Sequence, residues 1–89
     1  MDQGLTLFIL KACPYCKQVL RWMEELKQEN AAYGDIPLRI VDERKEPEVA
    51  ARHNYYYVPT YYLDGNKVHE GVANREIVRK VFEMALERG

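Results

Sequence analysis

Residues 5–16 read LTLFILKACPYC and carry the clearest structural pattern in the chain. The run from Leu5 to Leu10 is apolar and rich in β-forming residues, which is typical of a strand buried in a sheet. Pro14 suits the first turn of a helix, where the N–H that it lacks has no intrahelical partner. The sequence therefore predicts a strand that leads directly into a helix, with Cys13 and Cys16 at the junction.

The rest of the chain also alternates between strand and helix patterns. Asp64-Gly65 is typical of a two-residue hairpin turn, and Asn74 is a good N-cap for a last helix. The order β-α-β-α-β-β-α predicts an α/β fold with a parallel first half, an antiparallel hairpin, and one mixed four-stranded sheet flanked by helices. The further elements that we predict are a helix over 14–30, a strand over 38–42, a short helix over about 46–53, strands over 60–63 and 66–70, and a helix after Asn74.

Length and composition limit the classes of function. The 89 residues, 1–89, are expected to form one domain, and 47% hydrophobic residues exclude intrinsic disorder. The 13 basic and 14 acidic residues give a net charge of -1, so we expect no nucleic-acid partner. No apolar run approaches the roughly 20 residues of a membrane span. Because Met1 to Gly4 contain no basic residue, we expect no secretory leader and predict a cytoplasmic protein. Nothing in the sequence demands an oligomer, so we expect a monomer.

The two cysteines are the only ones in the chain, and they lie three positions apart. A small secreted protein held together by disulfides would carry more of them, so we expect this pair to have a chemical role and not to stabilise the fold as a structural disulfide. Cys13 lies at a helix N-terminus and is flanked by Lys11 and Lys17, which favours its thiolate and predicts that it is the exposed nucleophile. Cys16 lies one helical turn further in, where we expect it to be more buried and to resolve a mixed disulfide formed by Cys13.

Two alternatives give the cysteine pair no redox role. A CxxC pair can be half of a zinc site, but the other ligands would have to be His53 and His69, which lie in different elements without the usual spacing. Both cysteines could also be inert core residues, but the adjacent proline, lysines and helix start disfavour that. We therefore predict no metal site.

The motifs Cys13-Pro14-Tyr15-Cys16 and Val58-Pro59-Thr60 resemble those of the thioredoxin-like superfamily, and the first is similar to the active site of dithiol glutaredoxins. The resemblance covers about residues 5–86. It implies a thioredoxin-like fold, a thiol–disulfide oxidoreductase, and a cis peptide bond before Pro59. It also implies that the backbone of Val58 pairs with glutathione or a substrate peptide. Thioredoxins proper are less similar, because they carry a buried acidic residue at the position of Leu7.

The same resemblance implies a set of glutathione-binding residues, with two departures from the family pattern. Lys11 lies two residues before Cys13, whereas glutaredoxins place this lysine three residues before. Gly71 matches one glycine of the family's Gly-Gly turn, and Asn74 stands where an aspartate would hold the γ-glutamyl group. We expect glutathione as a co-substrate and no tightly bound cofactor. The alternatives are a redoxin that is reduced by thioredoxin reductase and serves a protein client, and a glutathione-assisted [2Fe–2S] carrier.

Two further segments lie near these motifs. Five of the seven tyrosines fall between residues 55 and 62. Tyr55 to Tyr57 are equally consistent with a core role and with an aromatic platform for a protein substrate, to which Tyr15 would contribute. Tyr61 and Tyr62 are expected to alternate between core and surface as strand residues. The charged run over 42–46 is expected to be a solvated loop. The resemblance also implies Arg44 or Lys45 as an alternative contact for glutathione.

Overall fold

The computed structural model of the chain describes residues 4–88, and residues 1–3, on which part of the leader prediction rests, lie outside that range. The predicted order of strands and helices is confirmed, with one additional 3-10 helix. The elements are β1 (Leu5–Ile9), α1 (Pro14–Glu29), η1 (Ala31–Asp35), β2 (Leu38–Asp42), α2 (Pro47–Ala51), β3 (Thr60–Leu63), β4 (Asn66–Glu70) and α3 (Arg75–Arg88).

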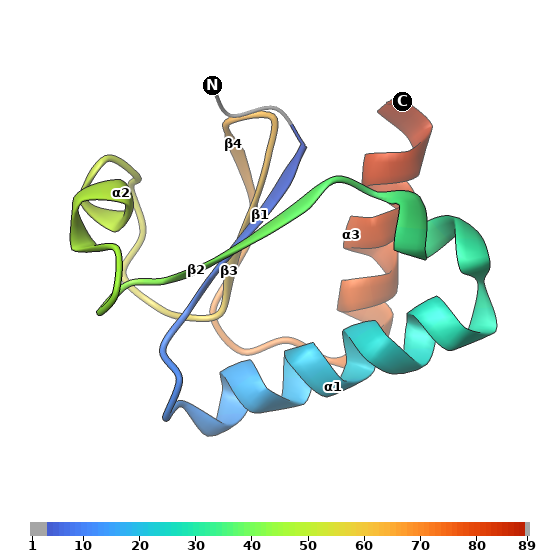
Figure 1. Cartoon of the computed structure of the whole chain (residues 1–89), viewed down its shortest axis with the longest axis horizontal. Helices are drawn as coiled ribbons and strands as arrows, with labels where there is room; N and C mark the ends of the chain where they lie inside the picture. The colour runs from blue at the N-terminus through green and yellow to red at the C-terminus, as the bar shows by residue number, and fades with distance from the viewer. Residues whose placement is uncertain (1–3, 89) are drawn as a thin grey trace.

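The four strands form one mixed sheet in the order β2-β1-β3-β4 (Figure 1). β1 and β2 run parallel, so the chain must cross over between them, and α1 makes that crossover. β3 is antiparallel to both β1 and β4. The β3–β4 turn is the predicted Asp64-Gly65 pair, whose φ angles of 52° and 84° are those of a tight hairpin turn. This arrangement places the end of β1, where Cys13 follows, at the centre of the sheet.

Helices cover both faces of the sheet. α1 and α3 lie on one face and α2 on the other (Figure 1). The larger core lies under α1 and α3, and the smaller one lies under α2, where the Phe8 ring contacts Tyr62 at a centroid distance of 5.6 Å. Tyr61 and Tyr62 point to opposite faces, yet they are only 0% and 7% exposed. The expectation that one of them would reach the surface is therefore wrong, because both faces of β3 are covered.

The end of α1 also differs from the prediction. The helix ends at Glu29, and Asn30 adopts an extended conformation while its side-chain oxygen accepts a hydrogen bond from the Ala32 amide at 3.0 Å. This cap starts η1, a 3-10 helix that the sequence pattern did not indicate. Short 3-10 helices lack the 3.6-residue periodicity by which helices are recognised in a sequence.

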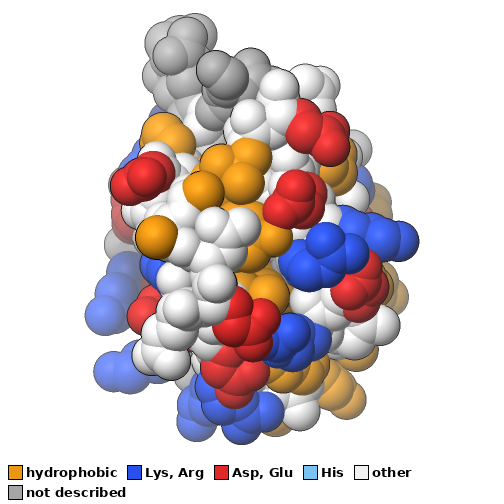
Figure 2. Space-filling view, turned by 90° about the vertical axis from the view of Figure 1, so that its right-hand side faces the viewer, with side chains coloured by type: hydrophobic (Ala, Val, Ile, Leu, Met, Phe, Trp, Pro, Cys, Tyr) orange, Lys and Arg blue, Asp and Glu red, His pale blue; other side chains and the backbone are white. Residues whose placement is uncertain are grey.

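Charged side chains join α3 to α1 at the surface. The Arg75 guanidinium lies 3.3 Å from a Glu25 carboxylate oxygen and also pairs with Glu29. Figure 2 shows basic and acidic side chains side by side on this flank of the molecule, around a strip of hydrophobic side chains. Within residues 4–88, no helix is both long and apolar enough to cross a membrane.

Candidate active site at the dithiol

The first turn of α1 presents the Cys13 sulfur to the surroundings. Cys13 is the N-cap residue, with φ -74° and ψ 122°, and Pro14 follows as the first helical residue. The Cys13 amide donates a hydrogen bond to the Leu10 carbonyl at 3.0 Å, and its carbonyl accepts one from the Lys17 amide at 3.1 Å. The side chain makes no capping hydrogen bond and is partly exposed. The backbone is therefore fixed, and the sulfur remains accessible to a substrate.

Cys16 lies one turn further along α1 and is 1% exposed. Its burial raises the pKa of its thiol from 9.0 to about 12, and the neighbouring Cys13 adds to the increase, while a backbone hydrogen bond at Leu10 opposes it. Desolvation acts in this direction because it disfavours the charged thiolate. The prediction that Cys16 is the more buried of the two thiols is confirmed.

The segment before β3 lies beside the dithiol. The peptide bond between Val58 and Pro59 is cis, as the resemblance implied. The Val58 carbonyl oxygen is 4.0 Å from the Cys13 sulfur, and Pro59 is buried. The Thr60 hydroxyl donates a hydrogen bond back to the Tyr57 carbonyl, which closes a turn around this bond. Backbone atoms of Val58 are thus close to the sulfur that would react.

Glu70 anchors the residues that precede this turn, a role that the sequence did not indicate. One of its carboxylate oxygens accepts hydrogen bonds from the amides of Tyr56 at 2.5 Å and Tyr57 at 3.0 Å, and the other lies 2.6 Å from the Lys67 ammonium. The Lys67 hydrogen bond and these amides lower the pKa of Glu70 from 4.5 to about 2. Because Glu70 is 13 and 14 residues away from its amide partners, no local sequence pattern could have predicted the contact.

Gly71 and Asn74, which the resemblance assigned to glutathione, lie between β4 and α3. The Gly71 amide donates a hydrogen bond to the Pro59 carbonyl at 2.8 Å, and its φ of 90° is one that glycine adopts without strain. The Asn74 side-chain oxygen accepts a hydrogen bond from the Ile77 amide at 2.8 Å and so caps α3. These atoms already have partners within the chain, and a role in glutathione binding stays a prediction for both residues.

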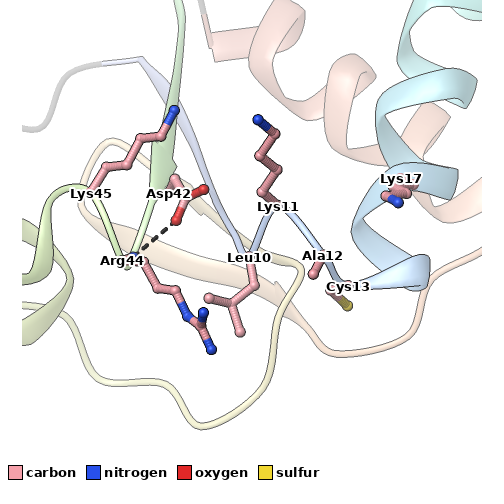
Figure 3. Close-up of a pocket in the computed structure, with 8 residues that line it drawn as sticks. All are labelled: Leu10, Lys11, Ala12, Cys13, Lys17, Asp42, Arg44 and Lys45. Atoms are coloured by element: carbon pink, nitrogen blue, oxygen red, sulfur yellow. Dashed lines mark hydrogen bonds between the residues drawn. The ribbon is translucent and has the colours of Figure 1, made fainter.

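A pocket of about 760 Å³ opens beside Cys13 (Figure 3). Among residues 4–88, four cationic side chains line it, and the only carboxylate in the lining is Asp42, which accepts a hydrogen bond from the Arg44 amide at 2.9 Å. In the view of Figure 3 the Arg44 guanidinium and the Cys13 sulfur point toward the same side of the pocket. The described lining of the pocket therefore carries an excess of positive charge. Its lining consists of Leu10, Lys11, Ala12, Cys13, Lys17, Asp42, Arg44 and Lys45.

The predicted site residues thus fall into separate groups. Lys11 lines the pocket, and so do both residues of the alternative glutathione contact, Arg44 and Lys45; Gly71 and Asn74 are not part of its lining. Tyr15 is 48% exposed on the first turn of α1 and also lies outside the lining. A second depression of about 560 Å³ shares Leu10 and Arg44 with the first and extends toward α2.

The tyrosines before Val58 differ in their environment. Tyr56 and Tyr57 are 87% and 69% exposed, which leaves their rings available to a partner. Tyr55 is partly buried, and its hydroxyl donates a hydrogen bond to a Glu43 carboxylate oxygen at 2.7 Å. The structure therefore divides the tyrosine run into one packing residue and two surface residues.

The histidines of the zinc alternative occupy separate places. The Nδ1 atom of His53 lies 2.9 Å from the Val49 carbonyl oxygen, and the Nε2 atom of His69 lies 3.0 Å from that of Val72. In the described part of the chain, no three side chains of histidine, cysteine, aspartate or glutamate come together as a set of metal ligands.

Comparisons with known proteins agree with this architecture. No curated protein sequence matched the chain. Among solved structures, Plasmodium falciparum thioredoxin is similar, with a TM-score of 0.70 and 24% identity over 91% of this chain and 83% of its own. Mitochondrial thioredoxin 3 from Saccharomyces cerevisiae has a TM-score of 0.69 and 23% identity, over 93% and 78%. Reduced Schistosoma mansoni thioredoxin has a TM-score of 0.62 and 26% identity, over 97% and 80%.

The family models give a more specific result than these structural likenesses. The model of the thioredoxin domain matches residues 6–83, a range that begins one residue into β1, contains the CxxC motif and ends within α3. The superfamily prediction is confirmed, whereas the glutaredoxin subtype stays a prediction. A thioredoxin-like domain with two cysteines one helical turn apart indicates thiol–disulfide oxidoreductase chemistry. On the extent of this match, the chain belongs to the thioredoxin domain family.

Proposed function

We propose that this protein is a dithiol oxidoreductase that reduces disulfides of anionic substrates, with glutathione mixed disulfides as the main class. The observation that carries the proposal is the placement of one accessible and one buried thiol beside a cationic pocket. An accessible thiol suits the first attack, and a buried thiol one turn away suits the second.

The reaction proceeds in two exchanges. The Cys13 thiolate attacks a substrate disulfide, bonds to one sulfur and expels the other as a thiolate. Cys16 then loses its proton to solvent and attacks the Cys13 sulfur, which closes the Cys13–Cys16 disulfide and expels the second substrate thiolate. The substrate gains two electrons and the dithiol loses two, so two molecules of glutathione or a reductase must restore the protein.

The charges around Cys13 support glutathione as the partner. Glutathione carries two carboxylates, and a charge-assisted hydrogen bond is roughly twice as strong as a neutral one. Lys11, Arg44 and Lys45 all line the pocket, and Arg44 is the one of the three whose charged group points to the side of the Cys13 sulfur in Figure 3. The Val58 carbonyl oxygen lies 4.0 Å from the Cys13 sulfur, and this proximity supports pairing of the Val58 backbone with an extended cysteinyl segment.

A second candidate keeps the chemistry and changes the electron source. The chain would then be reduced by a thioredoxin reductase and would serve a protein client, docked on the exposed Tyr56 and Tyr57. Asn74 favours this candidate, because its neutral side chain cannot pair with the γ-glutamyl ammonium group as an aspartate would. Membership of the thioredoxin domain family favours it as well.

One assay separates the two candidates. NADPH consumption is followed on a glutathione mixed disulfide, with either glutathione and its reductase or thioredoxin reductase alone, and Cys13→Ser is the control. We expect turnover with glutathione, and a lysine-to-glutamate change at Lys11 or Lys45 should raise KM with little effect on kcat. Turnover with thioredoxin reductase alone would establish the second candidate. No NADPH consumption with either reducing system would refute the enzymatic proposal.

A further inference from the structure

The hydroxyl group of Tyr61 makes no hydrogen bond with any described residue of the fold. The residue is 0% exposed in β3, on the face of the sheet that α1 and α3 cover. Its hydroxyl oxygen is buried and has no hydrogen-bond partner among residues 4–88. Burying a hydroxyl without a partner costs free energy, and a phenylalanine of the same shape would avoid that cost. Packing alone therefore does not account for a tyrosine at this position.

The neighbouring tyrosine shows how a buried hydroxyl is normally accommodated in this chain. Tyr62, on the opposite face of the sheet, donates a hydrogen bond to the Asn54 carbonyl at 2.8 Å and accepts one from the Asn54 amide at 3.0 Å. The Tyr61 hydroxyl has neither kind of contact. The difference points to a partner that Tyr61 acquires only in another state of the site.

Cys16 is the residue of the same core whose protonation and bonding change during the proposed reaction. The two residues belong to the same buried core, and Cys16 is 1% exposed. Burial and the charge of a Cys16 thiolate both raise the pKa of Tyr61, and within the described residues no other ionisable group contributes to that increase. The phenol therefore keeps its proton at neutral pH, which makes it available as a donor and not as a base.

The resolving step needs such a donor. Cys16 must ionise inside an apolar core before it can attack the Cys13 sulfur, and its high pKa opposes that. A backbone hydrogen bond at Leu10 is the one contact found to favour the thiolate among residues 4–88. A thiolate can accept more than one hydrogen bond, so a further donor in the same core would lower the cost of forming it.

We propose that Tyr61 is a positioning residue for the resolving cysteine, and that its hydroxyl donates a hydrogen bond to the Cys16 sulfur when that sulfur is ionised. The inference rests on the proposed dithiol chemistry. In the step itself Cys16 gives its proton to solvent, its thiolate bonds to the Cys13 sulfur, and the substrate sulfur leaves with the electron pair of the broken bond. Tyr61 keeps its own proton throughout.

The test compares Tyr61→Phe with Tyr62→Phe as a matched control. A chromogenic aromatic disulfide with one carboxylate on each ring releases one coloured thiolate when Cys13 attacks and a second when Cys16 resolves, so stopped-flow absorbance separates the two steps. Loss of one hydrogen bond to a thiolate would raise the pKa of Cys16 by about one to two units. The higher nucleophilicity of a more basic thiolate recovers roughly half of that, which leaves the second phase about three- to tenfold slower.

We expect Tyr61→Phe to slow the second phase by this factor at every pH between about 6 and about 9 while the first phase is unchanged. Tyr62→Phe should leave both phases unchanged, although it loses two hydrogen bonds and is the less stable variant. A normal second phase in Tyr61→Phe, or the same delay in Tyr62→Phe, would overturn the inference.

A second measurement separates failure of this inference from failure of the proposed function. In a Cys13→Ser background, which cannot catalyse exchange, the alkylation rate of Cys16 reports its thiolate fraction. Tyr61→Phe should lower that rate about threefold to tenfold in this background. An unchanged rate contradicts the hydrogen bond whatever the enzyme assays show. A lowered rate in a protein without Cys13-dependent exchange would keep the hydrogen bond and reject the enzymatic role.

Discussion

The burial of Cys16 predicts a large difference in reactivity between the folded and the unfolded chain. Alkylating reagents react with thiolates, and a pKa raised from 9.0 to about 12 reduces the thiolate fraction at neutral pH about a thousandfold. In a Cys13→Ser variant the contributions of Cys13 to this increase are lost, but burial, the largest cause, remains. The higher nucleophilicity of a more basic thiolate recovers part of this factor, but a sulfur that is 1% exposed also excludes the reagent. We therefore expect native Cys16 in that variant to react about a hundred to a thousand times more slowly than in urea.

The assay is alkylation by iodoacetamide, quenched at intervals and read by mass spectrometry, in native buffer and in denaturant at the same pH. The Cys16→Ser variant is the control, because its Cys13 sulfur is partly exposed and should react within about tenfold of the denatured rate. The alkylation rate of native Cys16 should also rise about tenfold for each pH unit, because the thiolate fraction rises by that factor when the pH lies far below the pKa. A native rate within about tenfold of the denatured rate would refute the assignment of Cys16 as the protected thiol.

Three further predictions concern stability and the substrate pocket. Glu70→Gln removes a carboxylate whose pKa is lowered to about 2 in the folded chain, so its stabilising effect is complete above pH 4.5 and disappears as the pH falls through 2. The free energies of unfolding of wild type and variant in urea should therefore become equal toward pH 2, and a difference between them that does not depend on pH would contradict the ionic contact. Asn74→Ala removes the cap of α3 and should lower the free energy of unfolding by about 1 kcal/mol. Asn74→Asp keeps the cap and should lower KM for a glutathione mixed disulfide, and equal KM values in the two variants would exclude this residue from glutathione binding. Phe82→Ala should lower the free energy of unfolding by about 3–5 kcal/mol, because the ring is 1% exposed and packs on Tyr33 at a centroid distance of 5.2 Å. Thermal unfolding measures this loss, and a value below about 1 kcal/mol would mean that the core closes around the cavity.

Local patterns predicted most of the fold because each element here has a local cause. The strands over 60–63 and 66–70 were predicted with their observed bounds, since Asp64-Gly65 adopts the turn that such a pair favours. The helix after Cys13 was predicted for a similar reason, with Pro14 in its first turn. Apart from η1, whose Asn30 cap is local, the features that were missed depend on distant partners.

Glu70 shows most clearly why part of the site could not be predicted. In the sequence it is a strand residue next to Gly71, and its effect arises only where β4 approaches the segment before Val58. The clustering of Arg44 and Lys45 with Cys13 is likewise a product of the parallel β1–β2 pair, which brings two strand ends together. For Tyr61, alternation along the strand was predicted correctly, but coverage of both faces is a property of the assembled helices.

The contact made by Glu70 has a consequence for how selectivity can change in this protein. It holds main-chain amides of residues 56 and 57 and leaves the Tyr56 and Tyr57 side chains 87% and 69% exposed. Because main-chain amides are the same in every residue except proline, the fold places little restriction on which side chains stand at these two positions. The surface next to the dithiol can therefore diversify, through natural variation or in a designed library, while the scaffold that aligns the sulfur stays constant.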